Sequence, residues 1–207
     1  MSTSALREEI CRVGRSLFDR GYSHGSTGNI SALTDDGKML VTPTNVSLGE
    51  LDPGRLSLLD RDGRVEEGPL PTKEIPLHGA MYASRAAGAV IHLHSIHSVA
   101  VSMLSGIDHQ DVFPPLTAYY LMRVGKTALL PYFQPGDPAI AEAILGLKGC
   151  YGAVLLANHG PVVAGQSLGE ACNAIEELEQ TAKLLLLLRN EAHNLVPITE
   201  AERLKTQ

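Results

Sequence analysis

Two histidines, His92 and His94, stand two residues apart in the stretch over residues 89–97. The apolar run that begins after Gly88 is rich in β-branched residues and predicts a buried strand. Side chains alternate between the two faces of a strand, so His92 and His94 are expected to point the same way. Two imidazoles on one face can both bind a single metal ion. The same pattern also fits one hydrogen-bonded core histidine beside an incidental one.

Further candidate donors occur at two other places in the chain. Asn158-His159-Gly160 ends a second apolar run, and Glu74 and His78 fall near the start of an expected helix. Pro76 must lie in the first turn of that helix, with residue 72 or 73 near its N-cap, because proline is not tolerated deeper. Glu74 and His78 are four residues apart and are then expected on one helix face. A glutamate at this position also fits a purely structural role, in which it interacts with the helix dipole.

Three histidines and one glutamate are a donor set that suits zinc. Neutral imidazoles leave most of the charge of the ion unneutralised, so an ion in such a site is a strong Lewis acid. Cysteine ligands would instead indicate a structural site. The donor types therefore predict a catalytic metal centre.

Two polar turns flank an expected β-hairpin. Ser23-His24-Gly25-Ser26-Thr27-Gly28-Asn29 precedes a strand over 30–33, and Thr42-Pro43-Thr44-Asn45 ends the return strand over 39–42. Asp35-Asp36-Gly37 is the hairpin signal between the strands. The glycine-rich turn fits either a simple chain reversal or a nest of backbone N–H groups that binds an anion.

The remaining pattern predicts alternating helices and strands, and hence one α/β domain over residues 1–207. Tyr119 and Tyr120 fall in a segment whose structure the pattern leaves open. Ser167 and Glu170 fit a capping box at the start of the last long helix. The apolar run over 184–188 in that helix exceeds what one face needs, so part of it is expected between subunits. Expected helices cover 4–20, 72–85, 98–104, 137–147 and 167–189, and further strands cover 56–59, 64–66, 127–131, 153–157 and 161–164.

The composition is that of an ordinary globular protein and excludes several partner classes. Apolar residues make up 44% and charged residues 19% of 207, and the net charge of −6 gives no electrostatic footprint for nucleic acid or an anionic membrane. Cys11, Cys150 and Cys172 are odd in number and widely spaced, which predicts reduced thiols rather than disulfides. The first residues resemble no signal peptide, and no apolar run approaches the roughly 20 residues of a membrane span, so a cytoplasmic location is expected.

Taken together, the motifs resemble those of the class II aldolase/adducin family over about residues 5–190. The motifs that carry the resemblance are Gly25-Ser26-Thr27-Gly28-Asn29-Ile30-Ser31, Thr42-Pro43-Thr44, Thr72-Lys73-Glu74 with His78, His92-Leu93-His94 and Asn158-His159-Gly160. Finer motifs are most similar to the members of the family that decarboxylate 3-oxo-tetronate 4-phosphates. Among them are Arg20-Gly21-Tyr22, Leu48-Gly49-Glu50-Leu51-Asp52-Pro53 and Glu176-Glu177-Leu178-Glu179.

The resemblance implies roles for individual residues. Glu74, His92, His94 and His159 match the metal ligands, with Zn²⁺ or another divalent cation as the cofactor, and Glu74 also matches the catalytic acid/base. The positions that bind the substrate phosphate fall on Gly28, Asn29, Thr44, Asn45, Thr72 and Lys73.

This chain departs from the aldolase pattern at two of these positions. Asn45 stands where the aldolases have glycine, and Lys73 where they have serine. A lysine beside the site suits a substrate that carries a carboxylate as well as a phosphate, although a solvated lysine at a helix start fits equally. Tyr132 matches the catalytic tyrosine of the aldolases, with Tyr119 as the rival.

The resemblance also implies a three-layer α/β/α sandwich around a largely antiparallel sheet, and a homotetramer with active sites between neighbouring subunits. The expected activity is decarboxylation of a 3-oxo-tetronate 4-phosphate to dihydroxyacetone phosphate and CO₂ through a zinc-stabilised enediolate. Protonation by Glu74, directly or through water, completes the reaction.

Two other functions remain compatible with the sequence. The first is a sugar-phosphate aldolase of the fuculose or rhamnulose type, or a ribulose-phosphate epimerase, with the same metal and another scissile bond. The second is a non-catalytic interaction domain of the adducin kind, against which the intact set of metal-ligand positions argues.

Overall fold

The first helix shows how the chain begins to build its core. In the computed structural model, which describes residues 2–147 and 151–204, helix α1 (Thr3–Asp19) starts where the Ser2 hydroxyl accepts a hydrogen bond from the backbone N–H of Ala5. Apolar side chains recur along one face at helical spacing and are buried, as predicted: Leu6, Ile10, Val13 and Leu17.

The strands of the described residues form one mixed sheet in the order β4-β3-β2-β1-β5-β8-β7-β6. Neighbouring strands are antiparallel except β6 and β7, which are parallel. The strand bounds are β1 (Asn29–Leu33), β2 (Met39–Val41), β3 (Ser57–Leu59), β4 (Val65–Glu67), β5 (Ala89–His92), β6 (Thr127–Leu130), β7 (Ala153–Leu156) and β8 (Gly160–Gly165). The predicted hairpin β1–β2 is confirmed, and the expected strands over 56–59 and 64–66 form a second hairpin, β3–β4.

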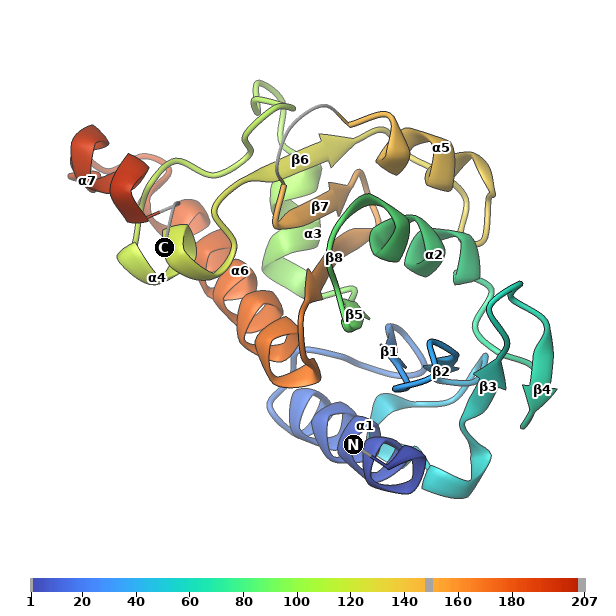
Figure 1. Ribbon diagram of the computed structural model, residues 1–207. Helices are drawn as coiled ribbons and strands as arrows, with labels where there is room; N and C mark the ends of the chain where they lie inside the picture. The colour runs from blue at the N-terminus through green and yellow to red at the C-terminus, as the bar shows by residue number, and fades with distance from the viewer. Residues whose placement is uncertain (1, 148–150, 205–207) are drawn as a thin grey trace.

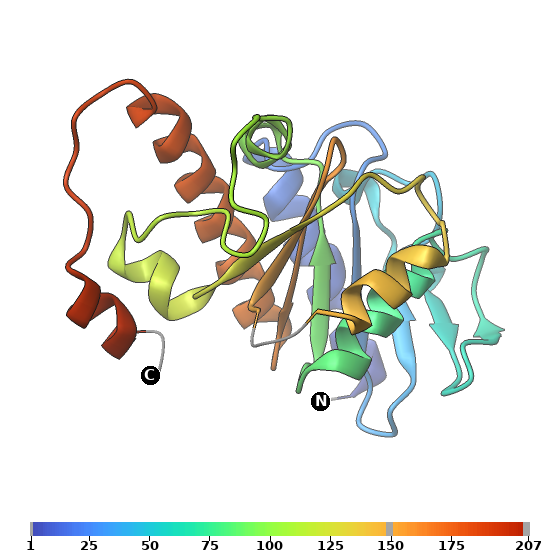
Figure 2. The ribbon, with the colours of Figure 1, turned by 90° about the horizontal axis from the view of Figure 1, so that it is seen from above.

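Helices cover both faces of the sheet, as Figures 1 and 2 show. Helices α2 (Ile75–Ser84) and α5 (Ala139–Leu145) lie together on one face. Helices α1, α3 (Ile96–Ser102) and α6 (Leu168–Leu188) cover the other, with α4 (Ala118–Arg123) beside α6 and α7 (Ile198–Leu204) beside α4. Two 3₁₀ turns, Leu48–Glu50 and Pro53–Arg55, connect β2 to β3. The predicted three-layer arrangement is confirmed.

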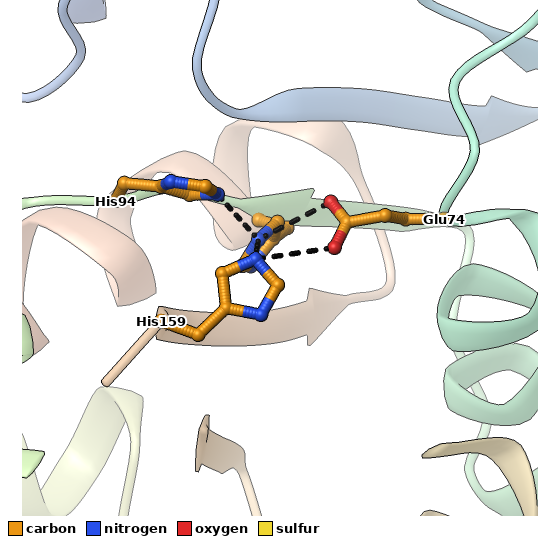
Figure 3. Close-up of side chains that lie close together, drawn as sticks. Glu74, His94 and His159 are labelled. Carbon is orange, nitrogen blue, oxygen red and sulfur yellow. Dashed lines mark hydrogen bonds and ion pairs between the residues drawn. The ribbon is translucent and has the colours of Figure 1, made fainter. Parts of the chain in front are cut away.

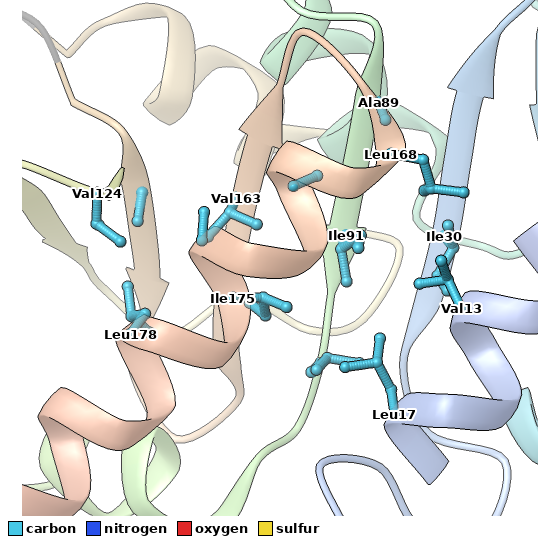
Figure 4. Close-up of a cluster of buried hydrophobic side chains, with 14 of the residues drawn as sticks. Val13, Leu17, Ile30, Ala89, Ile91, Val124, Val163, Leu168, Ile175 and Leu178 are labelled. Atoms are coloured by element: carbon cyan, nitrogen blue, oxygen red, sulfur yellow. The ribbon is translucent and has the colours of Figure 1, made fainter. Parts of the chain in front are cut away.

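The alternation of side chains along the central strands divides the core between the two faces. Ile91 of β5 packs with the α1 and α6 side, whereas its neighbour Val90 packs with α2 and α5. Figure 4 shows Leu17, Ile91 and Ile175 from three different elements meeting in the larger cluster. Full burial of a side chain of this size contributes about 1.5–3 kcal/mol, so this layer makes a large contribution to the stability of the fold.

Two local expectations require correction, and one segment that was left open is now assigned. Strand β5 ends at His92, so His94 follows the strand instead of lying within it, and α3 begins two residues later at Ile96. Glu74 itself is the N-cap residue of α2, where residue 72 or 73 was expected, because the backbone of Glu74 is not yet helical. Tyr119 belongs to helix α4, in the segment that the pattern left unassigned.

Other expectations are met. The Ser167 hydroxyl accepts a hydrogen bond from the backbone N–H of Glu170, as the capping motif predicted. Cys11 and Cys172 are free thiols, while Cys150 lies outside the described residues. Among the described residues, no helix combines the length and the apolar character needed to cross a lipid bilayer.

Candidate metal centre

Four side chains from three separate parts of the chain converge where the central strands β5 and β7 end. Glu74 comes from the start of α2, His92 from the end of β5, His94 from the segment after it, and His159 from the turn between β7 and β8. One ligand atom from each of the four lies within 4.8 Å of all the others. Figure 3 shows Glu74, His94 and His159 pointing toward one another. The predicted convergence is therefore confirmed.

Backbone geometry permits this approach at the β7–β8 turn. Gly160 has φ of +152°, and a Cβ atom there would lie only 2.1 Å from the carbonyl oxygen of Leu93. No residue other than glycine lets the segment that carries His94 pass so close to His159. Asn158 adopts φ of +57°, and its backbone N–H donates to the Ser102 hydroxyl.

The three imidazoles turn the same nitrogen toward a common point. The Nε2 atom of His92 lies 3.1 Å from Nε2 of His94 and 3.3 Å from Nε2 of His159. The carboxylate of Glu74 faces two of these rings, with Oε2 at 3.3 Å from His92 Nε2 and Oε1 at 3.2 Å from His159 Nε2.

A hydrogen bond fixes the tautomer of His92. Its Nδ1 donates to the carbonyl oxygen of Pro161 at 2.9 Å, so in the neutral ring Nε2 carries the lone pair. A second hydrogen bond of this kind is how proteins orient histidines that bind metals. His92 is thus prepared to offer Nε2 to a cation.

Electrostatics keep the rings of His94 and His159 neutral and the carboxylate of Glu74 charged at neutral pH. Burial, aided by His92, lowers the pKa of His94 to about 3 and that of His159 to about 4. Burial alone would raise the pKa of Glu74, but the neighbouring His92 and a hydrogen bond from Asn29 outweigh it and lower the pKa to about 2. Neutral imidazoles and an ionised carboxylate are the protonation states that bind metals.

The donor set fits a divalent cation. Glu74 Oε1 and His159 Nδ1 are buried and make no hydrogen bond to any residue that the structure describes, which is costly for polar atoms in a protein interior. A cation held by the four ligand atoms would satisfy Glu74 Oε1 and would separate the three Nε2 atoms that now face one another. Three histidines and a carboxylate suit zinc and also accept other first-row metals.

A small cavity of about 210 Å³ adjoins this centre. All six residues predicted to bind phosphate line it together, namely Gly28, Asn29, Thr44, Asn45, Thr72 and Lys73, and so do Glu74 and His94. The backbone N–H of Thr72 donates to the carbonyl oxygen of Thr42 at 3.1 Å, which joins the segment before α2 to the polar turn over residues 42–45. Four further residues line the cavity without having been predicted from the sequence: Ser26, Thr27, Pro43 and Pro135. The first three fall in the two polar turns that flank the hairpin.

Backbone conformation explains one of the two departures from the aldolase pattern. Asn45 has φ of +59°, in the left-handed region where glycine is usual and asparagine is the best-tolerated alternative. Asn45 therefore keeps the conformation of the turn and adds a polar side chain at the cavity. Lys73, the other departure, is exposed at the cavity wall.

Three sequence-predicted residues lie outside the metal cluster. Tyr132 and Tyr119 are 58% and 59% exposed and do not line the cavity, so a single chain brings neither tyrosine to the site. Pro135, three residues after Tyr132, does line it. His78, expected as company for Glu74, bonds through Nε2 to Asn29 and does not face the common point.

Comparison with known proteins gives consistent results. Residues 8–186 match the family model described as the Class II Aldolase and Adducin N-terminal domain. A 3-oxo-tetronate 4-phosphate decarboxylase of Escherichia coli (strain K12) is 50% identical over 185 residues, which cover 89% of this chain and 87% of that protein. An L-fuculose phosphate aldolase of Methanocaldococcus jannaschii is 34% identical and is covered to 96% of its length by 87% of this chain. The crystal structure of YgbL from Escherichia coli superposes with a TM-score of 0.95 at 45% identity, covering 98% of this chain and 99% of that one.

Proposed function

This chain belongs to the class II aldolase and adducin family, and from that membership we propose that it is a carboxy-lyase, a 3-oxo-tetronate 4-phosphate decarboxylase. The observation that carries the proposal is 50% identity over 89% of the chain to a protein with that activity. The substrate is a phosphorylated four-carbon sugar acid, and the products are dihydroxyacetone phosphate and CO₂.

Glu74, His92, His94 and His159 are proposed to hold one divalent cation, for which zinc is the first choice on donor type. When bound, the ion supplies Lewis acidity that stabilises negative charge on a ketone oxygen of the substrate. The fixed tautomer of His92 and the ionised state of Glu74 support this assignment.

The cavity beside the centre is proposed to bind the anionic substrate. Gly28, Asn29, Thr44, Asn45 and Thr72 offer backbone and side-chain donors to the phosphate. Lys73 is a cation at the same wall, and we assign it to the substrate carboxylate or phosphate end. Its charge suits a doubly anionic substrate better than a neutral residue would.

The chain's own proton carrier is proposed to be Glu74. Loss of CO₂ breaks the bond between C1 and C2 of the substrate and leaves the electron pair on C2, next to the C3 ketone, so no base is needed to start the reaction. Glu74, which is ionised before the reaction, takes up a proton from solvent water and passes it to C2, directly or through water, which completes dihydroxyacetone phosphate. Tyr132 remains the proposed catalytic tyrosine.

The assembly is proposed to be a homotetramer with sites between subunits. In support, Tyr132 is exposed near a loop that reaches the cavity, and Leu187 in the apolar run of α6 is 65% exposed. Phosphorylated sugar acids do not cross membranes unaided, so the substrate favours a cytoplasmic location. We also propose that residues 1–207 form a single domain.

A sugar-phosphate aldolase is the second candidate, since an aldolase of the family is 34% identical to this chain. Both 3-oxo-tetronate 4-phosphate and L-fuculose 1-phosphate yield dihydroxyacetone phosphate, so one coupled assay with NADH and an auxiliary dehydrogenase reads both reactions. We expect the higher kcat/KM with the tetronate. A higher kcat/KM with L-fuculose 1-phosphate would overturn the proposal in favour of the aldolase.

A further inference from the structure

His78 is a fully buried histidine for which the proposed reaction has no role. It follows Glu74 by one helical turn, and both of its ring nitrogens have partners. Nε2 bonds to Oδ1 of Asn29, and Nδ1 lies 2.7 Å from the hydroxyl of Ser31. The Ser31 hydroxyl is in turn 2.7 Å from the hydroxyl of Tyr82. A continuous series of side-chain hydrogen bonds thus leads from Tyr82 to the candidate metal centre.

The charge of Glu74 determines the direction of the two nearest hydrogen bonds, from Asn29 to Glu74 and from His78 to Asn29. An ionised carboxylate only accepts hydrogen bonds, so the contact of 2.7 Å between Asn29 Nδ2 and Glu74 Oε2 is donated by Asn29. The amide oxygen of Asn29 therefore faces His78. Because that oxygen only accepts, Nε2 of His78 must carry the proton.

The directions of the remaining hydrogen bonds, at Ser31 and Tyr82, follow from the same rule. A fully buried imidazole is neutral and has a single N–H, so Nδ1 of His78 is an acceptor. The Ser31 hydroxyl donates to it and, having given up its only proton, accepts from the Tyr82 hydroxyl. Every bond from Tyr82 to Glu74 then has one direction.

We propose that His78 is a positioning residue that locks the Asn29 amide, and through it the Glu74 carboxylate, in the orientation that faces His92 and His159. Ser31, with Tyr82 behind it, donates to Nδ1 of His78 and so satisfies the buried acceptor that this tautomer leaves. The inference rests on the proposed function in taking Glu74 as a metal ligand and proton carrier.

These hydrogen bonds disfavour the flipped orientation of the Asn29 amide. If the Asn29 amide turned over, its NH₂ group would meet the N–H of His78 and its oxygen would meet the Glu74 carboxylate. Both contacts are repulsive, and both lie in the buried interior, where unpaired polar groups are costly. Glu74 has no cap hydrogen bond of its own to the helix, so Asn29 is its side-chain anchor within the described residues.

Ser31→Ala is the first test, with Thr127→Val as its matched control. Each variant removes one buried hydroxyl from a strand and leaves a tyrosine hydroxyl without its partner, Tyr82 in one case and Tyr120 in the other. Only Ser31 connects to His78. We expect similar falls in melting temperature for both, but a loss of zinc affinity on the order of tenfold and a fall in kcat at unchanged KM for Ser31→Ala alone.

A pair of substitutions at His78 is the second test. His78→Met removes both ring nitrogens and should weaken zinc binding by roughly 10–100-fold, whereas His78→Gln keeps an N–H for Asn29 and should recover part of the loss. Zinc affinity is measured by competition with a chromogenic chelator, and kcat and KM with 3-oxo-tetronate 4-phosphate. Ser31→Ala keeps the proposal testable if the His78 variants do not fold.

The outcomes separate this inference from the proposed function. Wild-type zinc affinity and kcat in folded Ser31→Ala or His78→Met would overturn it, as would equal losses in Thr127→Val. A wild-type protein that does not turn over the tetronate would refute the proposed function, while the comparison of zinc affinities would still decide the role of His78.

Discussion

Gly160→Ala is expected to dismantle the metal centre without touching a ligand. The added Cβ would lie 2.1 Å from the carbonyl oxygen of Leu93, and such contacts essentially never fall below 3.0 Å. Because the obstacle is backbone, the two segments that carry His94 and His159 must part by about 0.9 Å. Metal–ligand distances tolerate only about 0.2 Å of variation, so one of the two rings is drawn out of reach.

The expected magnitude follows from that displacement. Misplacing a catalytic group by about 1 Å can cost on the order of 10²-fold in rate, and we expect a similar loss of zinc affinity. The conformation of Gly160, with φ of +152°, adds strain of about 1–3 kcal/mol for alanine.

Gly165→Ala is the matched control, at the other end of strand β8. Its Cβ would lie 2.5 Å from the backbone nitrogen of Ala171, so it also destabilises the fold, but far from the ligands. Zinc affinity is measured by chelator competition and stability by thermal unfolding for both variants. The reasoning would be refuted by Gly160→Ala binding zinc as tightly as Gly165→Ala.

Four further outcomes are expected. His92→Ala, His94→Ala and His159→Ala should each abolish turnover and lower the zinc content found by elemental analysis; near-normal turnover with full zinc would remove that residue from the ligand set. Glu74→Gln should lower kcat by roughly 10²–10⁴-fold in steady-state kinetics, and a smaller loss would count against its role as proton carrier. Lys73→Ala should mainly raise KM, because a contact made before CO₂ leaves is ground-state binding; unchanged constants would make Lys73 a bystander. Metal-free protein should lose stability as pH falls from about 6.5 toward 4. The pKa values of His94 and His159 are about 3 and 4 in the folded chain, so the unfolded chain takes up those two protons first. Chemical denaturation at pH 7.5 and 4.5 measures this, and equal free energies of unfolding at the two pH values would contradict it.

Local patterns predicted much of the fold, because each depends on neighbours in the sequence. The hairpin at Asp35-Asp36-Gly37 and the cap at Ser167 are set by turn and cap chemistry within a few residues. The order of the sheet is different in kind. Strand β1 pairs with β5, which places Asn29 opposite His92, and this pairing depends on packing between segments about 60 residues apart. The three layers followed from the family resemblance rather than from spacing.

The ligand residues could be predicted, but not the geometry that unites them. His92 and His94 were expected side by side on a strand, yet the strand ends at His92 because the chain turns there to begin α3. The rings still meet, since Gly160 and the close approach of Leu93 bring the β7–β8 turn to both.

The role of His78 shows where sequence patterns reach their limit. Spacing from Glu74 placed it on the correct helix but could not reveal that its ring turns away from the ligands toward Asn29 and Ser31. The finer motifs behave similarly. The guanidinium of Arg20 donates a hydrogen bond of 2.7 Å to the carboxylate of Glu176, which lies 156 residues later in the sequence. Neither motif alone predicts this contact.

The most direct test of metal-dependent decarboxylation is the stoichiometry of the products before and after removal of the metal. Zinc-loaded protein is incubated with 3-oxo-tetronate 4-phosphate, and CO₂ and dihydroxyacetone phosphate are counted against the substrate consumed. We predict one of each per substrate, loss of both after treatment with a chelator, and their return when zinc is added back. Dihydroxyacetone phosphate without CO₂, or full activity in protein free of metal, would contradict the account.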